Sequence, residues 1–228
     1  MEQTESDFLP ALGALATTGW LRDQDPAFRS RIAEHGRWKS FSPGSTVYAV
    51  GDDPDGLYGL AEGNFDVSIP IGEEEMVTIF RAEPGSWIGD SAVLARTPRA
   101  VEVVTPVASR MLFVPTSALR RILRDHPGDW SALYGLSHIN TMRAAAVIGD
   151  LLALSPQARL ARTLLRLSDA DGLAICTQQE LAALCGMSRT SFRRAFSDHI
   201  DRGVIRTEYG AVRILDRAAL ERTIRNGW

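Results

Sequence analysis

Three arginines fall within seven residues near the C-terminus, in the segment SRTSFRR at positions 188–194. A guanidinium group pairs with phosphate and can donate two hydrogen bonds to guanine O6 and N7, so this spacing predicts contact with DNA. The competing interpretation is a helical hairpin whose arginines form an ordinary solvated face. The candidate DNA-binding residues are Thr177, Ser188, Arg189, Thr190, Ser191, Arg193 and Arg194.

Two short helices joined by a tight turn would position these side chains. Thr177 is expected to cap the first helix, and Glu180, three residues later, completes a capping box. Gly186 is expected to end that helix, because glycine adopts the left-handed conformation at little cost, and Ser188 is expected to cap the second. A DNA-reading helix-turn-helix presents the first residues of its second helix to the major groove.

The surrounding chain favours the DNA-binding interpretation. Residues 204–206 and 211–215 are predicted as two strands around Tyr209-Gly210, which makes a wing. Residues 156–228 hold 12 arginines and 8 acidic residues, a net charge of +4, whereas residues 1–155 hold 13 basic and 20 acidic residues, a net charge of −7. This asymmetry indicates that one end of the chain meets phosphate.

Short apolar runs separated by glycine or proline turns fill residues 43–114. Many short strands with regular turns predict a sandwich or barrel. Asp25-Pro26 is expected to open a helix before this region, and Ser117 to cap a helix after it. The predicted fold is α+β, with an N-terminal double-stranded β-helix or jelly roll, a long helix and a C-terminal winged helix-turn-helix. The predicted strands are residues 46–50, 57–61, 65–69, 76–80, 87–88, 100–104 and 111–114.

A long helix is predicted over residues 128–154, where apolar side chains recur every three or four positions. Such a stripe can cover the barrel on one side and pair with a twin helix on the other. The candidate dimerisation residues are Leu136, Ile139, Met142 and Ala146. Ser155-Pro156 then breaks the chain. The predicted domains are a sensory β-roll over 1–127, a dimerisation helix and hinge over 128–155, and a winged helix-turn-helix over 156–228.

Composition excludes several other classes of protein. The chain of 228 residues is 45% hydrophobic and 23% charged, as in an ordinary globular protein, and Cys176 and Cys185 are its two cysteines. Neither a disulfide framework nor a cysteine-ligated cluster is expected, and Cys185 is expected to be a small core residue. The sequence contains neither a signal-peptide pattern nor a run of 18 apolar residues, so we expect a cytoplasmic protein. His126, His138 and His199 are expected at the surface or at helix caps.

The order of β-roll, long helix and winged helix-turn-helix resembles the Crp/Fnr family of bacterial transcription regulators, over roughly residues 10–228. The segment IGDSAVLARTPRAVEV, residues 88–103, is similar to the phosphate-binding cassette of cyclic-nucleotide-binding domains. The matching positions are Gly89, Ala92, Pro98, Arg99 and Ala100.

A cyclic phosphate carries one negative charge and needs a guanidinium and several backbone N–H groups. The resemblance implies that Arg99 supplies the guanidinium and that Asp90 meets the ribose hydroxyl, with an aspartate where the family usually has a glutamate. A structural ion pair between Arg99 and a nearby carboxylate such as Glu102 is the alternative. The candidate ligand-binding residues are Gly89, Asp90, Ser91, Ala92, Arg99 and Ala100.

One departure concerns the base. The family's cyclic-AMP receptor contacts adenine with a Thr-Ser pair on the long helix, and the matching positions here are Ala144 and Ala145. We therefore expect weak, poorly discriminating binding of cyclic AMP and cyclic GMP, or a different small anion. Residues 1–175 contain no cysteine for an iron–sulfur sensor, and no histidine lies between His35 and His126 for a haem sensor or a cupin-type metalloenzyme. No metal site and no enzymatic activity are expected.

The sequence therefore predicts a homodimeric transcription regulator that binds a pseudo-palindromic operator in double-stranded DNA and is controlled by a small anion in the roll. RNA polymerase is a further candidate partner, and no membrane contact is expected. Two alternatives stay open: a ligand-independent regulator with a vestigial pocket, and a cyclic-nucleotide module that does not bind DNA.

Overall fold

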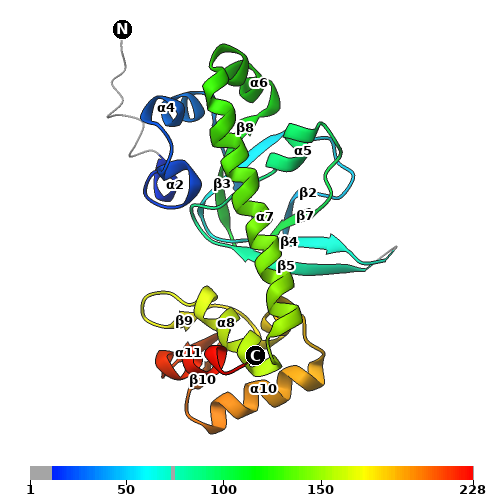
Figure 1. Cartoon of the computed structure of the whole chain (residues 1–228), viewed down its shortest axis with the longest axis vertical. Helices are drawn as coiled ribbons and strands as arrows, with labels where there is room; N and C mark the ends of the chain where they lie inside the picture. Colours follow the sequence, from blue (N-terminus) through cyan, green and yellow to red (C-terminus); the bar gives the residue numbers. More distant parts are fainter. Residues whose placement is uncertain (1–11, 73–74, 228) are drawn as a thin grey trace. The chain divides into compact units, whose positions relative to one another are not determined.

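The structure, a computed structural model, describes residues 12–72 and 75–227 (Figure 1). They form two compact units: residues 12–72, 75–76 and 80–143 make the first, and residues 77–79 and 144–227 make the second. The predicted α+β class, with a β-roll, a long helix and a winged helix-turn-helix, is confirmed. The division expected at residues 127 and 155 stays a prediction. No helix of the described residues could span a membrane.

Two four-stranded antiparallel sheets build the β-roll of the first unit. The first sheet has the order β1(Arg37–Phe41), β8(Ser109–Pro115), β3(Gly56–Glu62) and β6(Trp87–Ile88). The second has the order β2(Ser45–Tyr48), β7(Glu102–Thr105), β4(Phe65–Pro70) and β5(Met76–Ala82). Short helices flank the roll: α2(Ala14–Thr17), α3(Gly19–Arg22), α4(Pro26–His35), α5(Asp90–Ala95) and α6(Thr116–Asp125).

Some local expectations hold and others do not. The Asp25 side chain accepts a hydrogen bond from the Ala27 N–H at 2.9 Å and caps α4, as predicted. Ser117 was expected to cap α6 and does not, because that helix begins at Thr116 with Pro115 at its N-cap. Strand β1 was not predicted, since RWKSF has no apolar alternation; its ladder with β8 defines it.

The core of the roll is aromatic. Trp20 makes edge-on contacts with Phe28 and Trp87, with ring centroids 5.8 and 5.4 Å apart. The Trp20 indole also donates a hydrogen bond to the carbonyl of Ala132 at 2.8 Å. Since Ala132 lies in α7(Trp130–Ala153), this bond fixes the start of the long helix to the roll.

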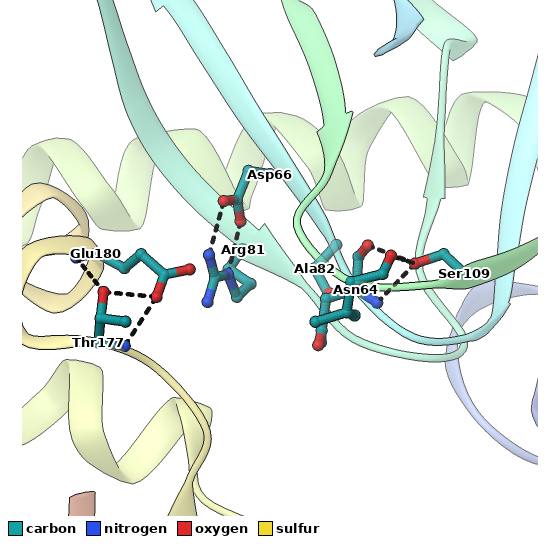
Figure 2. Close-up of polar contacts among 8 residues, drawn as sticks. Asn64, Asp66, Arg81, Ala82, Ser109, Thr177 and Glu180 are labelled. Carbon is teal, nitrogen blue, oxygen red and sulfur yellow. Dashed lines mark hydrogen bonds and ion pairs between the residues drawn. The ribbon is translucent and has the colours of Figure 1, made fainter. Parts of the chain in front are cut away.

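Polar side chains join the turns of the roll (Figure 2). Ser109 donates to the Asn64 carbonyl at 2.9 Å, and the Asn64 side chain donates to the Ala82 carbonyl at 3.2 Å. Arg81 is buried and donates two hydrogen bonds to Asp66, at 2.7 and 2.8 Å. A paired, nearly buried guanidinium of this kind holds β4 and β5 together near their ends.

The long helix α7 buries one side of its first half in the roll. Leu133 and Leu136 belong to the core of the β-roll, and Leu136 is 1% exposed. The expectation that Leu136 contacts a twin helix is therefore wrong, because its side chain is already covered within its own chain. Ile139 packs partly against the same core.

The second unit contains α8(Pro156–Leu167), β9(Leu173–Ala174), α9(Gln178–Leu184), α10(Arg189–Asp201), β10(Ile205–Glu208), β11(Ala211–Ile214) and α11(Arg217–Arg225). Ser155 caps α8 by accepting from the Ala158 N–H, a role that was not predicted, and Pro156 occupies the first position of the helix. Strand β9 and helix α11 were not predicted. Strand β9 is two residues long and exists because it pairs with β11.

Replacing Leu136 with alanine should lower the free energy of unfolding by about 2–5 kcal/mol, because it opens a cavity under α7. Urea unfolding of the full chain measures this change. Thr141→Ala, at an exposed position of the same helix, is the control and should leave stability nearly unchanged. An unchanged midpoint for Leu136→Ala, or a shift from dimer to monomer without loss of stability, would contradict the buried assignment.

Candidate nucleic-acid interface and phosphate cassette

The first helix of the helix-turn-helix is capped as predicted. The Thr177 backbone N–H donates to the Glu180 carboxylate at 2.8 Å, and the Glu180 N–H donates to Thr177 Oγ1 at 3.2 Å (Figure 2). Gly186 follows the C-cap residue with a φ of +59°, which a side chain rarely adopts. These two ends fix the length of α9 and the turn that leads into α10.

The second helix, α10, divides into a buried and an exposed side. Ser188 caps it by accepting from the Ser191 N–H at 3.2 Å. Phe192 and Phe196 are buried and stack with their ring centroids 5.2 Å apart. The remaining positions of the first two turns point away from this core. The exposed residues are Arg189, Thr190, Arg193 and Arg194.

The arginines of this exposed side lack carboxylate partners. Within residues 12–72 and 75–227, neither Arg189, Arg193 nor Arg194 forms an ion pair or side-chain hydrogen bond. By contrast, Arg202 near the end of α10 pairs with Asp198 at 3.3 Å. Three unneutralised guanidinium groups at the positive end of a helix dipole form a surface suited to phosphate.

The predicted wing is present as β10 and β11, joined through Tyr209 and Gly210. The Glu208 carboxylate accepts hydrogen bonds from Arg213 and Arg206, at 2.5 and 2.9 Å. These bonds lower the pKa of Glu208 to about 2. The wing's hairpin is therefore held by a charged cluster, and the Tyr209 side chain at its tip is fully exposed.

His199 corrects an expectation: it is 0% exposed in the core of the second unit and is not a surface or capping residue. Its Nε2 lies 3.2 Å from the carbonyl of Gln157 in α8. Burial lowers the pKa of the His199 imidazole below its ordinary value of 6.5. Cys185 lies in this core as predicted, and burial raises the pKa of its thiol to about 11.

In the first unit, Gly89 begins the cassette at the end of β6. Its φ is +101°, and a Cβ there would lie 2.7 Å from Nη1 of Arg99 and 2.8 Å from the Gly56 carbonyl oxygen. Only glycine fits both the backbone conformation and this close approach. The glycine therefore lets the Arg99 side chain lie flat beneath the loop.

Arg99 is 2% exposed, and its two terminal nitrogens donate hydrogen bonds to the roll itself. Its Nη2 donates to Asp55 Oδ1 at 2.8 Å and to the Gly56 carbonyl at 2.7 Å, and its Nη1 donates to the Gly89 carbonyl at 3.1 Å. The guanidinium carbon lies 4.1 Å from the centroid of the Tyr48 ring. Asp55, and not Glu102, is thus the structural partner. The Arg99 Nε is buried without a hydrogen-bond partner.

Asp55 is held in turn by two further residues. The Tyr58 hydroxyl donates to Asp55 Oδ2 at 2.6 Å, and Lys39 Nζ donates to the Tyr58 hydroxyl at 3.2 Å. Burial, together with the hydrogen bond to Asp55, raises the pKa of Tyr58. The Asp55 side chain remains about half exposed, so solvent and solutes can reach the acidic side of the pair.

Asp90 makes contacts that the sequence did not reveal. Its side chain is 4% exposed and accepts from the Ser137 hydroxyl at 2.6 Å and from the Asn140 side chain at 2.7 Å. Asn140 also donates to the Trp87 carbonyl at 3.1 Å. Ser137 and Asn140 lie on α7, so both carboxylate oxygens of Asp90 join the cassette to the long helix.

The other predicted cassette residues lie around this centre. Ser91 and Ala92 occupy the first turn of α5, where backbone N–H groups have no partner within the helix. Ser91 and Ala100 are exposed and Ala92 is buried. Ala144 and Ala145 are exposed on α7. No group of three or more potential metal ligands occurs among the residues that the structure describes.

Two family descriptions match separate parts of the chain. Residues 38–126 match the cyclic nucleotide-binding domain, and residues 158–223 match the Crp-like helix-turn-helix domain. The first contains the cassette and the second contains α9, α10 and the wing.

Similar proteins cover nearly the full length. The CRP-like cAMP-activated global transcriptional regulator of Mycobacterium tuberculosis is 28% identical over 222 residues, covering 92% of this chain and 98% of that protein. The transcriptional regulator LdrP of Thermus thermophilus is 27% identical over 190 residues, covering 81% of this chain and 95% of that protein. A solved CRP/FNR-family regulator from Thermus thermophilus shares the fold, with a TM-score of 0.69 at 22% identity. The match covers 83% of this chain and 98% of the solved one.

The buried imidazole predicts a pH dependence. Because folding lowers the pKa of His199, the native state binds fewer protons than the unfolded chain, and stability should fall as the pH drops below 6.5. Urea unfolding between about pH 7.5 and pH 5.5 should show this loss in the wild type. The variant His199→Leu has no imidazole to titrate, so its free energy of unfolding should fall less over the same pH interval. Equal losses in both proteins would exclude His199 as the cause.

Proposed function

This chain belongs to the Crp/Fnr family of DNA-binding transcription regulators, and we propose that it reads its operator with α10, as a homodimer, under the control of a small anion in the β-roll. The observation that carries the DNA-reading assignment is the exposed side of α10, where Arg189, Arg193 and Arg194 have no carboxylate partner among the residues that the structure describes. In the same unit, Arg202 and Arg213 are paired with Asp198 and Glu208.

Each part of the motif has a proposed role on DNA. Arg189 and Arg194 would reach guanine edges in the major groove, and Arg193 would neutralise phosphate. Ser188, Thr190, Ser191 and Thr177 would donate hydrogen bonds to the backbone from the two helix starts. In a symmetric dimer the two recognition helices must lie about 34–36 Å apart, one turn of DNA, so the operator is proposed to be pseudo-palindromic.

Dimerisation is proposed through the exposed apolar side of α7. Large apolar side chains remain exposed along this helix, and soluble monomers rarely leave such a surface uncovered. Of the four residues predicted for this contact, Met142 and Ala146 are exposed, whereas Leu136 faces the core and Ile139 is partly buried. The large exposed apolar residues of α7 are Trp130, Tyr134, Met142, Ile148, Leu151 and Leu152.

An anion would enter the cassette by replacing Asp55 on Arg99. The guanidinium already faces one exposed carboxylate, and a cyclic phosphate presents the same charge and a similar set of oxygens. Cyclic AMP and cyclic GMP are the ligands proposed, in line with the cyclic nucleotide-binding domain and the cAMP-activated relative. Ala144 and Ala145 offer no side-chain hydrogen bonds to a base, so selectivity between the two should be low.

The proposed signal runs through Asp90. A ligand that moves the start of α5 would alter the hydrogen bonds from Asp90 to Ser137 and Asn140, and so the contact between cassette and long helix. Differential binding to two arrangements of α7 would then shift the population of the DNA-binding state. The proposal includes a cytoplasmic location and contact with RNA polymerase. The protein would act as a regulator and not as an enzyme.

Arg189→Ala should weaken binding to the preferred operator by about 1–3 kcal/mol and relax the sequence preference at one base pair. Selection of binding sites from random duplexes, followed by titration at fixed salt, measures both effects. Arg217→Ala, on the exposed side of α11, is the matched control and should keep the wild-type consensus. The same consensus for Arg189→Ala and the wild type would exclude base reading by Arg189.

Ile148→Glu should convert the dimer to a monomer at micromolar concentration, because it places two charges in an apolar contact. The affinity for the operator should fall as the dimer is lost, because a monomer can contact only one half-site. Sedimentation velocity and operator titration on the same sample test the link. A wild-type protein that sediments as a monomer would remove the dimer from the proposal.

Calorimetry with cyclic AMP and cyclic GMP tests the cassette. Asp55→Asn keeps the shape but removes the competing charge, so it should bind both nucleotides about tenfold more tightly than the wild type. Arg99→Gln should abolish binding. The two nucleotides should differ by less than about tenfold in affinity, because no side chain reads the base. Absence of binding in the wild type and in Asp55→Asn would favour the ligand-independent alternative, and strong adenine selectivity would contradict the role given to the alanine pair.

A further inference from the structure

A concave site in the first unit has a lining that includes neither Arg99 nor Asp90. It has a volume of about 320 Å³ and lies between α5, α6 and the first residue of α7. Val93, Leu119, Leu123 and Trp130 give it an apolar lining. The Trp130 side chain is 51% exposed, which is unusual for so large an apolar group. A volume of this size falls in the range of about 300–1,000 Å³ that suits small-molecule ligands.

The charge around this cavity has one sign. Arg96, Arg120 and Arg124 line it, and no acidic residue of the described chain does. Arg124 pairs with Asp125 at 3.0 Å, but neither Arg96 nor Arg120 has an ion pair or side-chain hydrogen bond within the part of the chain that the structure describes. Two exposed guanidinium groups beside an apolar wall have no counter-charge among the described residues, so the site is complementary to an anion with an apolar body.

The backbone at Arg96 supports the same conclusion. Arg96 ends α5 with a φ of +58° and is the one residue other than glycine with a positive φ in the described ranges. This conformation is unusual for an arginine, and such outliers gather at functional sites. Arg96 follows the turn of α5 that contributes Val93 and Leu94 to the lining of the cavity, and Arg96 itself lines it.

We propose that this cavity binds an amphipathic monocarboxylate, with its carboxylate between Arg96 and Arg120 and its aliphatic chain against Leu119, Leu123 and Trp130. Arginine pairs with carboxylate through parallel hydrogen bonds, and the chain removes apolar surface from water. The site goes beyond the cassette and does not require a ligand there. The two sites share α5, whose first turn carries Asp90 and whose last turn faces the cavity, so occupancy of one can alter the other.

The test uses the full chain and three eight-carbon probes that differ only in the head group: octanoate, 1-octanol and octylammonium. Calorimetry should show one saturable octanoate site per chain, binding of 1-octanol weaker by at least about tenfold, and no binding of octylammonium. Octanoate should also change the tryptophan fluorescence, and Trp130→Phe should remove that change.

Variants locate the anion. Arg96→Gln and Arg120→Gln should each weaken the binding of octanoate by at least about tenfold and leave the affinity for 1-octanol unchanged. Arg121→Gln is the matched control, because Arg121 is exposed on the same helix but does not line the cavity, and it should bind octanoate like the wild type. Lack of saturable octanoate binding, equal binding of octanoate and 1-octanol, or equal losses in Arg120→Gln and Arg121→Gln would overturn the proposal. Loss of binding in Arg99→Gln, but not in Arg96→Gln or Arg120→Gln, would assign the anion to the cassette and overturn it too.

Discussion

The buried guanidinium of Arg99 is the constraint around which the β-roll is organised. A charge this deep is tolerated only when it is paired and hydrogen-bonded. The roll meets this need with the Asp55 carboxylate, the carbonyls of Gly56 and Gly89, and the face of Tyr48. Because Gly89 must leave room for the guanidinium, the turn between β6 and α5 needs a residue without a side chain. The position of α5 follows from that turn.

Helix α5 then connects the cassette to α7. Asp90 is buried at its first position and is held by Ser137 and Asn140, so the cassette and the long helix share a polar contact in an otherwise apolar interface. Buried carboxylates are costly when their partners leave, and a contact of this kind favours discrete arrangements over gradual movement. The same helix contributes Val93 and Arg96 to the cavity on its other side. This short helix thus takes part both in the cassette and in the cavity.

Three arginines of the first unit serve the fold. Arg81 and Arg99 in the roll and Arg31 in α4 are paired with carboxylates at 2.7–2.8 Å. On α10 the arginines of the first two turns have no such partner among the described residues, although carboxylates occur elsewhere in the unit and pair with Arg202, Arg206 and Arg213. Since an unpaired surface charge contributes little to stability, the exposed side of α10 is free to serve DNA.

The sequence determined the elements that rest on local chemistry. The caps at Asp25, Thr177 and Ser188 each satisfy backbone N–H groups two or three residues away, and the glycine at 186 adopts the left-handed turn that its position requires. The periodicity of residues 128–154 identified a helix, and the glycine-punctuated runs identified most strands. These interactions span a few residues and can be read from a single chain.

Tertiary structure decided everything that depends on partners distant in sequence. Strand β1 lacks an apolar pattern and is defined by its pairing with β8, about 70 residues later. The carboxylate that neutralises Arg99 comes from Asp55, 44 residues away, although Glu102 is nearer along the chain. Leu136 and Tyr134 are two residues apart on one apolar helix, yet one is buried in the roll and the other is exposed. Periodicity reveals an apolar helix, but only packing determines which of its sides meets the core and which is left for a partner.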